Sequence, residues 1–266
     1  MENESKNKLS IPLAIVVAGL LIAGAVYLSG SKAQDTAVVA GNQVKNDTQT
    51  ATASIALRGI TVTDHSLGNP EADIAMVEFS DTECPFCKNF HNTLKSIIAD
   101  YGSSGKVSWI YRHFPLIQLH PKAPKEAEST ECVNDLGGNS AFWKYLDSIF
   151  EVTPSNNGLD EAQLPILAKK AGVDQKAFET CLSSGKNKDK VDTDYNEALT
   201  AGGRGTPFTI LILKKKMDDD KNATITTLAS QFPPDTITIS DDGTKIAISG
   251  ALPLDLMKSI IDTLLK

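Results

Sequence analysis

The chain has 266 residues, of which 41% are hydrophobic and 22% are charged. This composition is ordinary for a globular protein and excludes global disorder. The length suits one medium-sized domain once a terminal segment is set aside. The net charge of -7 leaves no basic surface for phosphates, so we expect no nucleic-acid partner.

The N-terminal segment predicts export. Residues 11–28 carry no charge and consist mainly of Ala, Val, Leu, Ile and Gly. About 18 apolar residues can just cross a bilayer as a helix. Lys6 and Lys8 precede this stretch, which favours a cytoplasmic N-terminus at residues 1–10. The alternative is a cleaved signal peptide, because Ser31-Lys32-Ala33 loosely fits a cleavage site.

Both interpretations export the rest of the chain. We expect a single-pass protein of the cell membrane whose folded part lies outside the cytoplasm. Residues 29–58 are polar and lack an apolar period, which predicts a flexible spacer. Residues 59–266 then form one domain, which we expect to be monomeric.

The first predicted elements of this domain alternate between strand and helix. A short apolar run at residues 74–79 predicts a buried strand. Apolar residues then recur three or four positions apart from Phe86 to Tyr101, which predicts a helix that begins near Pro85 and is capped by Gly102. Residues 107–114 predict a second strand. This order implies a right-handed crossover between two parallel strands.

The rest of the domain predicts a helical insert and a return to the sheet. The insert covers about residues 121–201, with Asn139 as one helix cap and Asp160 with Gln163 as a capping box. The elements expected after it are a strand at 208–213, a hairpin of strands 236–240 and 244–249, and a helix at 254–265. We therefore expect an α/β fold with a four- or five-stranded sheet. Residues 217–234 exceed what a hairpin needs, and the sequence gives them no function.

Cys84 and Cys87 form a C-x-x-C motif at the start of the predicted helix. Unpaired backbone N–H groups and the helix dipole stabilise an anion at that position. The pKa of the first thiol is thereby lowered, and only the thiolate is active in disulfide exchange. We assign Cys84 as the exposed attacking sulfur and Cys87, one turn deeper, as the resolving sulfur. The alternatives are half of a zinc site and a purely structural disulfide.

The context of the motif supports the redox interpretation. Gly205-Thr206-Pro207 opens a later strand, where a proline cannot donate to the sheet. We expect a cis peptide bond before Pro207, next to the reactive sulfur.

Several stretches taken together resemble the DsbA-like branch of the thioredoxin superfamily. They occur in the family's order over about residues 60 to 265: Leu67-Gly68-Asn69-Pro70, Val77-Glu78-Phe79-Ser80-Asp81, Cys84-Pro85-Phe86-Cys87, Tyr111-Arg112-His113-Phe114-Pro115-Leu116, Phe142-Trp143 and Gly205-Thr206-Pro207-Phe208. The resemblance implies a thioredoxin-like fold with a helical insertion, a cis-proline at Pro207, and disulfide exchange with exported proteins.

The resemblance also assigns roles near the motif. Glu78 corresponds to a buried carboxylate that relays the proton of Cys87, and the alternative is a solvent-facing glutamate at the sheet edge. Thr206 either tunes the redox pair or is a simple turn residue. Phe86 departs from the best-known members, which have a histidine there that stabilises the thiolate. We therefore expect a less extreme oxidant.

The other two cysteines, Cys132 and Cys181, fall in the helical insert. In an oxidising compartment we expect a structural disulfide between them, worth roughly 4 kcal/mol. The alternatives are two buried free thiols, or a zinc site shared with the first pair.

The sequence predicts no cofactor and no metal site, because the histidines at positions 65, 91, 113 and 120 show no metal-ligand spacing. We expect His91 to play a plain surface role. The leading hypothesis is a dithiol oxidase whose substrates are reduced or unfolded exported proteins and which is reoxidised by a membrane thiol oxidase. The alternatives are a reductase or isomerase of the same fold, and a redox-inert anchored module that binds peptides.

Overall fold

The computed structural model describes residues 52–266. The predicted cytoplasmic N-terminus, the transmembrane segment at 11–28 and most of the spacer lie outside the described residues. Within residues 52–266, no helix combines the length and the apolar composition needed to cross a membrane.

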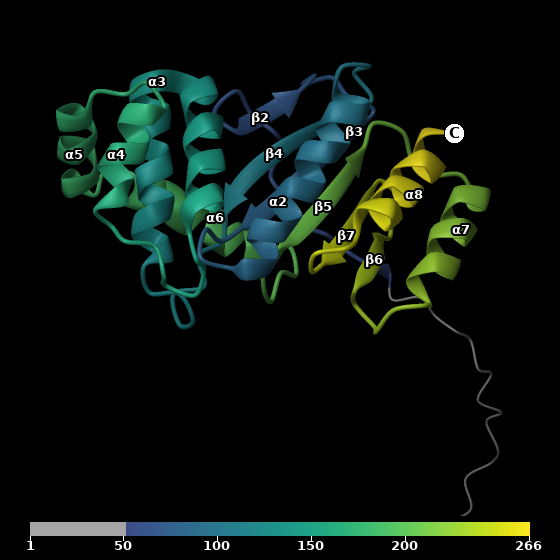
Figure 1. The fold of residues 1–266 in the computed structure, drawn as a ribbon. Helices are drawn as coiled ribbons and strands as arrows, with labels where there is room; N and C mark the ends of the chain where they lie inside the picture. The colour runs from purple at the N-terminus through teal and green to yellow at the C-terminus, as the bar shows by residue number, and fades with distance from the viewer. Residues whose placement is uncertain (1–51) are drawn as a thin grey trace, which may run out of the picture. The chain divides into compact units, whose positions relative to one another are not determined.

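Seven strands and seven α-helices make up the described part of the chain (Figure 1). The strands are β1 (Thr52–Ala53), β2 (His65–Gly68), β3 (Ile74–Ser80), β4 (Val107–His113), β5 (Phe208–Leu213), β6 (Ile237–Ser240) and β7 (Lys245–Ser249). The α-helices are α2 (Pro85–Ile97), α3 (Ala123–Val152), α4 (Gln163–Lys170), α5 (Gln175–Ser184), α6 (Lys188–Thr200), α7 (Asp219–Ala229) and α8 (Leu254–Leu265). A π-helical turn at Ile98–Gly102 continues α2.

The strands form one mixed sheet in the order β1-β6-β7-β5-β3-β4-β2. The central strand β3 pairs in parallel with β4 and antiparallel with β5. All seven residues of β3 are buried, because helices cover both faces of the sheet. Helices α2 and α8 lie on one face and α6 lies on the other (Figure 1).

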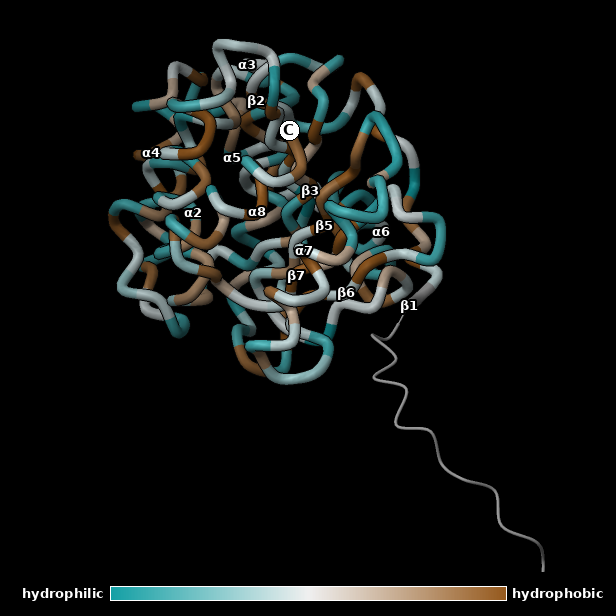
Figure 2. The backbone as a smooth tube through the Cα atoms, turned by 90° about the vertical axis from the view of Figure 1, so that its right-hand side faces the viewer, coloured by the Kyte–Doolittle hydropathy of each residue, from teal (hydrophilic) through white to brown (hydrophobic). Residues whose placement is uncertain are grey.

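The alternation of side chains along β3 decides what lies beneath α2. Ile74 and Met76 pack into the core on the α2 side, whereas Ala75, Val77 and Phe79 pack into the core on the α6 side. Since side chains in a strand alternate between the two faces, Glu78 points to the same face as Met76. The hydropathy colouring shows brown, apolar stretches running through the strands and mostly teal turns at the periphery (Figure 2).

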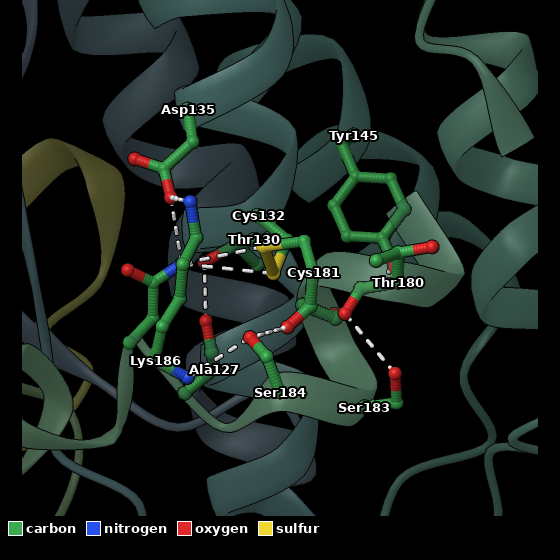
Figure 3. The surroundings of a disulfide bond; sticks show 12 residues. Ala127, Thr130, Cys132, Asp135, Tyr145, Thr180, Cys181, Ser183, Ser184 and Lys186 are labelled. Carbon is green, nitrogen blue, oxygen red and sulfur yellow. Dashed lines mark hydrogen bonds and ion pairs between the residues drawn. A yellow bond between two sulfur atoms is a disulfide. The ribbon is translucent and has the colours of Figure 1, made fainter. Parts of the chain in front are cut away.

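The helical insert has a core of its own. Helices α3, α4 and α5 bury a cluster that includes Tyr145, Leu164 and Phe178. Cys132 on α3 and Cys181 on α5 form a disulfide in this cluster, with a Cα–Cα distance of 5.8 Å (Figure 3). Because the bridge closes a loop of 49 residues, it stabilises the insert by about 4 kcal/mol in the chain-entropy model.

The folded domain begins earlier than the sequence predicts. β1 pairs with β6, and Ile55 is buried, so the predicted spacer at 29–58 is too long at its C-terminal end. Arg58 is held by ion pairs of 2.8 to 3.0 Å to three carboxylates, those of Asp64, Asp194 and Glu197. Asp194 and Glu197 are more than a hundred positions away in sequence, which is why local composition did not reveal this network.

The sheet has seven strands rather than four or five. The two strands that the sequence analysis missed at the start of the domain, β1 and β2, are only 2 and 4 residues long, too short for a clear period-two pattern. Residues 217–234, for which the sequence offered no role, contain α7, which packs against α8.

Three predicted helix caps differ in the structure. Gly102 ends the π-helical turn without a left-handed conformation, which Gly105 adopts instead (φ 72°). Asn139 follows a kink in α3 at Gly138 (φ 73°), but its side chain bonds to Ser66 of β2 rather than capping the helix. Asp160 accepts a hydrogen bond from the N–H of Ala162, and no side chain caps α4.

Candidate functional site

The loop between β3 and α2 is fixed to the helical insert on several sides. Asp81 accepts hydrogen bonds from the backbone N–H groups of Glu83 and Leu116, both at 2.8 Å, and from Nδ1 of His120 at 2.9 Å. Its side chain is therefore fully engaged, and it ties the start of the loop to the segment after β4.

The next two residues of the loop are tied to the insert itself. Thr82 donates its hydroxyl to Glu126 Oε2 of α3 at 2.7 Å. The carboxylate of Glu83 accepts from the N–H groups of Gly158 and Leu159, at 3.2 and 3.0 Å. Burial and the neighbouring Glu83 carboxylate raise the pKa of Glu126 to about 8. The insert thus determines where the motif begins, a role that the sequence analysis missed because the partners are far apart in the chain.

Cys84 occupies the N-cap position of α2, and Pro85 is the first helical residue. Cys84 is only 4% exposed, so the prediction of an exposed sulfur is wrong. The Sγ of Cys84 donates to the backbone oxygen of Thr206 at 3.4 Å, and this cis-proline segment covers it. The pKa of the Cys84 thiol falls to about 6, mainly because Cys87 donates an S–H hydrogen bond to the thiolate. The Thr206 hydroxyl, which has no other partner, and the N–H groups of Cys87 and Phe86 add to this effect.

Cys87 lies one turn deeper and is 0% exposed. The N–H of Asp81 approaches its Sγ to 3.5 Å. Burial, followed by the charge of the Cys84 thiolate and that of Glu78, raises the pKa of Cys87 well above its ordinary value. The two sulfurs of the motif therefore differ sharply: the first is stabilised as an anion, and the second is held as a neutral thiol.

Glu78 lies beneath this pair and is completely buried, so the alternative of a solvent-facing glutamate is wrong. Trp109 donates its indole N–H to Glu78 Oε2 at 3.0 Å, while Oε1 has no hydrogen-bond partner. Desolvation raises the pKa of the carboxyl to about 7. A carboxyl near neutrality with one free oxygen beside Cys87 can both hold and release a proton.

Thr206 and Pro207 complete the site at the start of β5. The peptide bond between them is cis, and the chain enters β5 directly after Pro207. The antiparallel pairing of β5 with β3 brings this segment to the same edge as the motif, since Phe208 is opposite Phe79. The structure thus brings Cys84, Cys87, Glu78, Thr206 and Pro207 together, while the Cys132–Cys181 bridge belongs to the separate core of the insert.

No charged side chain of the motif itself stabilises the thiolate. The ring of Phe86 is 64% exposed and contributes an apolar surface beside Cys84. His91, for which we expected a surface role, is instead 2% exposed and bonds to Asp147 at 2.6 Å. The prediction was wrong because the ring of His91 packs against Trp109 and Phe150. Helical periodicity alone does not show whether a histidine at this position is buried or exposed.

A family model described as "Thioredoxin" matches residues 60–229, which is more than half of the chain. The chain belongs to the thioredoxin family. Within that family its fold is DsbA-like, with the helical insert between β4 and β5.

Two solved structures illustrate the likeness. Pseudomonas aeruginosa DsbA2 is 24% identical with a TM-score of 0.55, over 77% of this chain and 96% of that one. Wolbachia pipientis α-DsbA1 is 23% identical with a TM-score of 0.58, over 77% of this chain and 92% of that one. At these identities the likeness establishes the fold.

Among curated proteins, the chain is similar to a Na(+)/H(+) antiporter NhaA 3 of Salinispora tropica, 30% identical over 144 residues. The match covers 54% of this chain but only 21% of the antiporter. The chain therefore spans about a fifth of the length of this relative, and the antiport activity in its name is not carried over.

The low pKa of Cys84 predicts a pH profile for alkylation. In the reduced full chain, the rate at which iodoacetamide modifies Cys84 should rise with pH to a plateau with a midpoint near pH 6, because the thiolate is the nucleophile. Mass spectrometry assigns the modified cysteine, and buried Cys87 should stay unmodified over the same range. A midpoint near 9.0, the ordinary thiol value, would contradict this description of the site.

The raised pKa of Glu78 predicts a pH-dependent cost of folding. A carboxyl with a pKa of about 7 in the folded protein and 4.5 when unfolded binds its proton more tightly when folded. The free energy of unfolding therefore falls as pH rises through this window, by about 3 kcal/mol in total. Glu78→Gln should remove that fall, so that the variant becomes the more stable protein above about pH 7.

Urea unfolding of the reduced proteins between about pH 4 and about pH 8 measures the effect. Glu71→Gln is a suitable control, since the Glu71 side chain is 83% exposed and should show no such change. An equal shift in stability at every pH would indicate altered packing instead of titration, and would contradict the assignment.

Proposed function

We propose that this protein is an exported, membrane-tethered thiol–disulfide oxidoreductase that introduces disulfides into exported proteins. The observation that carries the proposal is the asymmetry of the two sulfurs. The pKa of Cys84 at the N-terminus of α2 is lowered to about 6, whereas the pKa of buried Cys87 is raised. Disulfide exchange needs one sulfur that attacks and leaves easily and one that resolves the intermediate.

In the first step the substrate becomes covalently bound to Cys84 as a mixed disulfide. In the oxidised protein, a thiolate of the substrate attacks Cys84 Sγ and breaks the Cys84–Cys87 bond. Cys87 leaves with the electron pair and takes up a proton. Glu78, whose free oxygen lies in this buried space and whose carboxyl has a pKa of about 7, supplies that proton.

The second step releases the product. A second thiolate of the substrate attacks the substrate sulfur of the mixed disulfide, and Cys84 leaves as a thiolate. Its low pKa makes it a good leaving group. Two substrate thiols have then lost two electrons and become a disulfide, and the enzyme holds a reduced Cys84–Cys87 pair.

The stability of the reduced pair supports the oxidase direction. At pH 7, lowering the pKa of Cys84 from 9.0 to about 6 stabilises the dithiol by about 1.4 kcal/mol, which makes the disulfide more oxidising by about 30 mV. A membrane thiol oxidase would accept the electrons, and an anchor at residues 11–28 would keep the enzyme near it. A reductase or an isomerase would use the same chemistry in other directions.

The test is disulfide transfer by the oxidised full chain to a reduced, unfolded protein. We expect each chain to form one substrate disulfide and to become reduced itself, as measured by thiol counting. Cys84→Ser should abolish the transfer. Cys87→Ser, with the attacking sulfur intact, should instead attack a substrate that carries an activated disulfide, release one thiolate, and accumulate as the mixed disulfide on Cys84.

Other outcomes would contradict the proposal. Reduction of substrate disulfides by the dithiol form, without transfer from the oxidised form, would identify a reductase. Unchanged peptide binding in both variants, together with no exchange in the wild type, would identify a redox-inert binding module.

A further inference from the structure

A second cluster of chemically capable side chains lies away from the redox pair. His65 of β2, His113 at the end of β4 and Glu131 of α3 meet in the interior, each no more than 2% exposed. The Nε2 atoms of His65 and His113 both lie close to Glu131 Oε1, at 2.7 and 2.8 Å. All three ligand atoms lie within 4.8 Å of one another.

We propose that this cluster is a binding site for a divalent transition-metal ion, for which Zn²⁺ is the representative. Two imidazole nitrogens and one carboxylate oxygen form a donor set that suits such ions. In a tetrahedral zinc site, ligand atoms lie roughly 3.3 Å apart, given metal–ligand distances of about 2.0 Å. The two separations between a histidine Nε2 and Glu131 Oε1 therefore need to lengthen by only about half an ångström to admit an ion.

The positively charged group in contact with the cluster is the ammonium of Lys190 on α6. Its Nζ lies 2.6 Å from Glu131 Oε2 and 3.1 Å from Nε2 of His65. The ammonium contacts Oε2 of Glu131, whereas the two histidines contact Oε1. The buried carboxylate therefore already stabilises a positive charge. Lys190 competes with a metal ion, so binding is an exchange in which the ammonium withdraws as the ion enters.

The structure provides a place for the displaced ammonium and a route for the ion. A surface cavity of about 640 Å³ is lined by His65 and Lys190 themselves, together with Asp64, Asp135 and Asp194. The Lys190 side chain is 32% exposed, so it reaches this cavity without unfolding of α6. A metal ion can therefore approach His65 from solvent through this cavity, where Asp64 and Asp194 are already paired with Arg58, which also lines it.

The histidine ring chemistry is compatible with this exchange. Coordination through Nε2 places the ring proton on Nδ1. His113 Nδ1 is buried and has no hydrogen-bond partner, so no other bond fixes the tautomer of this ring. Thr130 Oγ1, 3.4 Å from His113 Nε2, is the nearest further oxygen on α3.

Metal binding here would join the insert to the sheet. The three ligands come from β2, β4 and α3, so one ion would link the edge strand β2 and its neighbour β4 to the first helix of the insert. A ligand that binds only the folded state raises its stability by mass action. The site is independent of the redox activity, and its failure or success leaves the proposed function unchanged.

The experiment is a titration of the oxidised full chain with Co²⁺ and Zn²⁺, since in that form no free thiol competes for metal. Co²⁺ should give visible d–d bands at one ion per chain without a thiolate charge-transfer band. Zn²⁺ should displace Co²⁺ and raise the melting temperature. Glu131→Gln should abolish both effects.

Lys190→Met is the decisive variant. It removes the competing ammonium, so the affinity for Co²⁺ should increase at least about tenfold. It also leaves Glu131 without its cation, so the melting temperature should fall without metal and recover with Zn²⁺. Lys188→Met is the matched control, because Lys188 is on the same helix but pairs with exposed Asp192. The affinity of this control variant for Co²⁺ should stay unchanged.

The absence of Co²⁺ bands and of any Zn²⁺ effect on melting in a folded Lys190→Met variant would overturn the proposal. The cluster would then be a hydrogen-bond network alone. Binding that survives Glu131→Gln would also overturn it, because the ion would occupy another site.

Discussion

The stabilisation of a negative charge on Cys84 is the interaction on which the site depends. The sulfur stands at the N-cap of α2, where backbone N–H groups are unpaired, and Cys87 and Thr206 contribute further donors. None of these groups carries a formal charge. The thiolate is thus stabilised by position, and the position is fixed by the loop before α2, whose Asp81 and Glu83 side chains are anchored on other segments.

That dependence gives the helical insert a role in the chemistry. Thr82 and Glu83 bond to α3 and to the segment after it, so the insert holds the residues that precede the motif. The Cys132–Cys181 bridge then acts indirectly, because it stabilises the helices on which these contacts depend. The thioredoxin sheet supplies the reactive pair, and the insert supplies much of its surroundings.

Sequence patterns predicted the parts of the molecule that local chemistry determines. The apolar run of β3, the proline at the start of α2 and the hairpin around Gly243 each have a short-range signature, and the structure has them. Glu78 was placed correctly by the resemblance to the DsbA-like branch, and the alternation of side chains along β3 explains why it is buried on the α2 face. The pairing of cysteines 132 and 181 followed from their number and from the export signal.

Long-range contacts account for what the sequence did not predict. The network of Arg58 and Arg112 with Asp64 and Glu197 joins residues more than a hundred positions apart in the chain, and it extends the domain into the predicted spacer. The approach of His65, His113 and Glu131 has the same origin, since their spacing in sequence matches no metal motif. Strand pairing and helix packing bring these residues together, and no local periodicity of the sequence predicts such contacts.

The reduction potential of the Cys84–Cys87 pair tests the central claim most directly. A thiol pKa of about 6 lies between about 7 for thioredoxin and about 3.5 for DsbA. A thiolate stabilised by position without a charged neighbour should therefore give a potential between those two proteins, above about -270 mV but short of about -120 mV. Equilibration of the full chain with glutathione measures it. A value at or below about -270 mV would contradict the account, because the Cys84 thiolate would then be no better stabilised than that of thioredoxin.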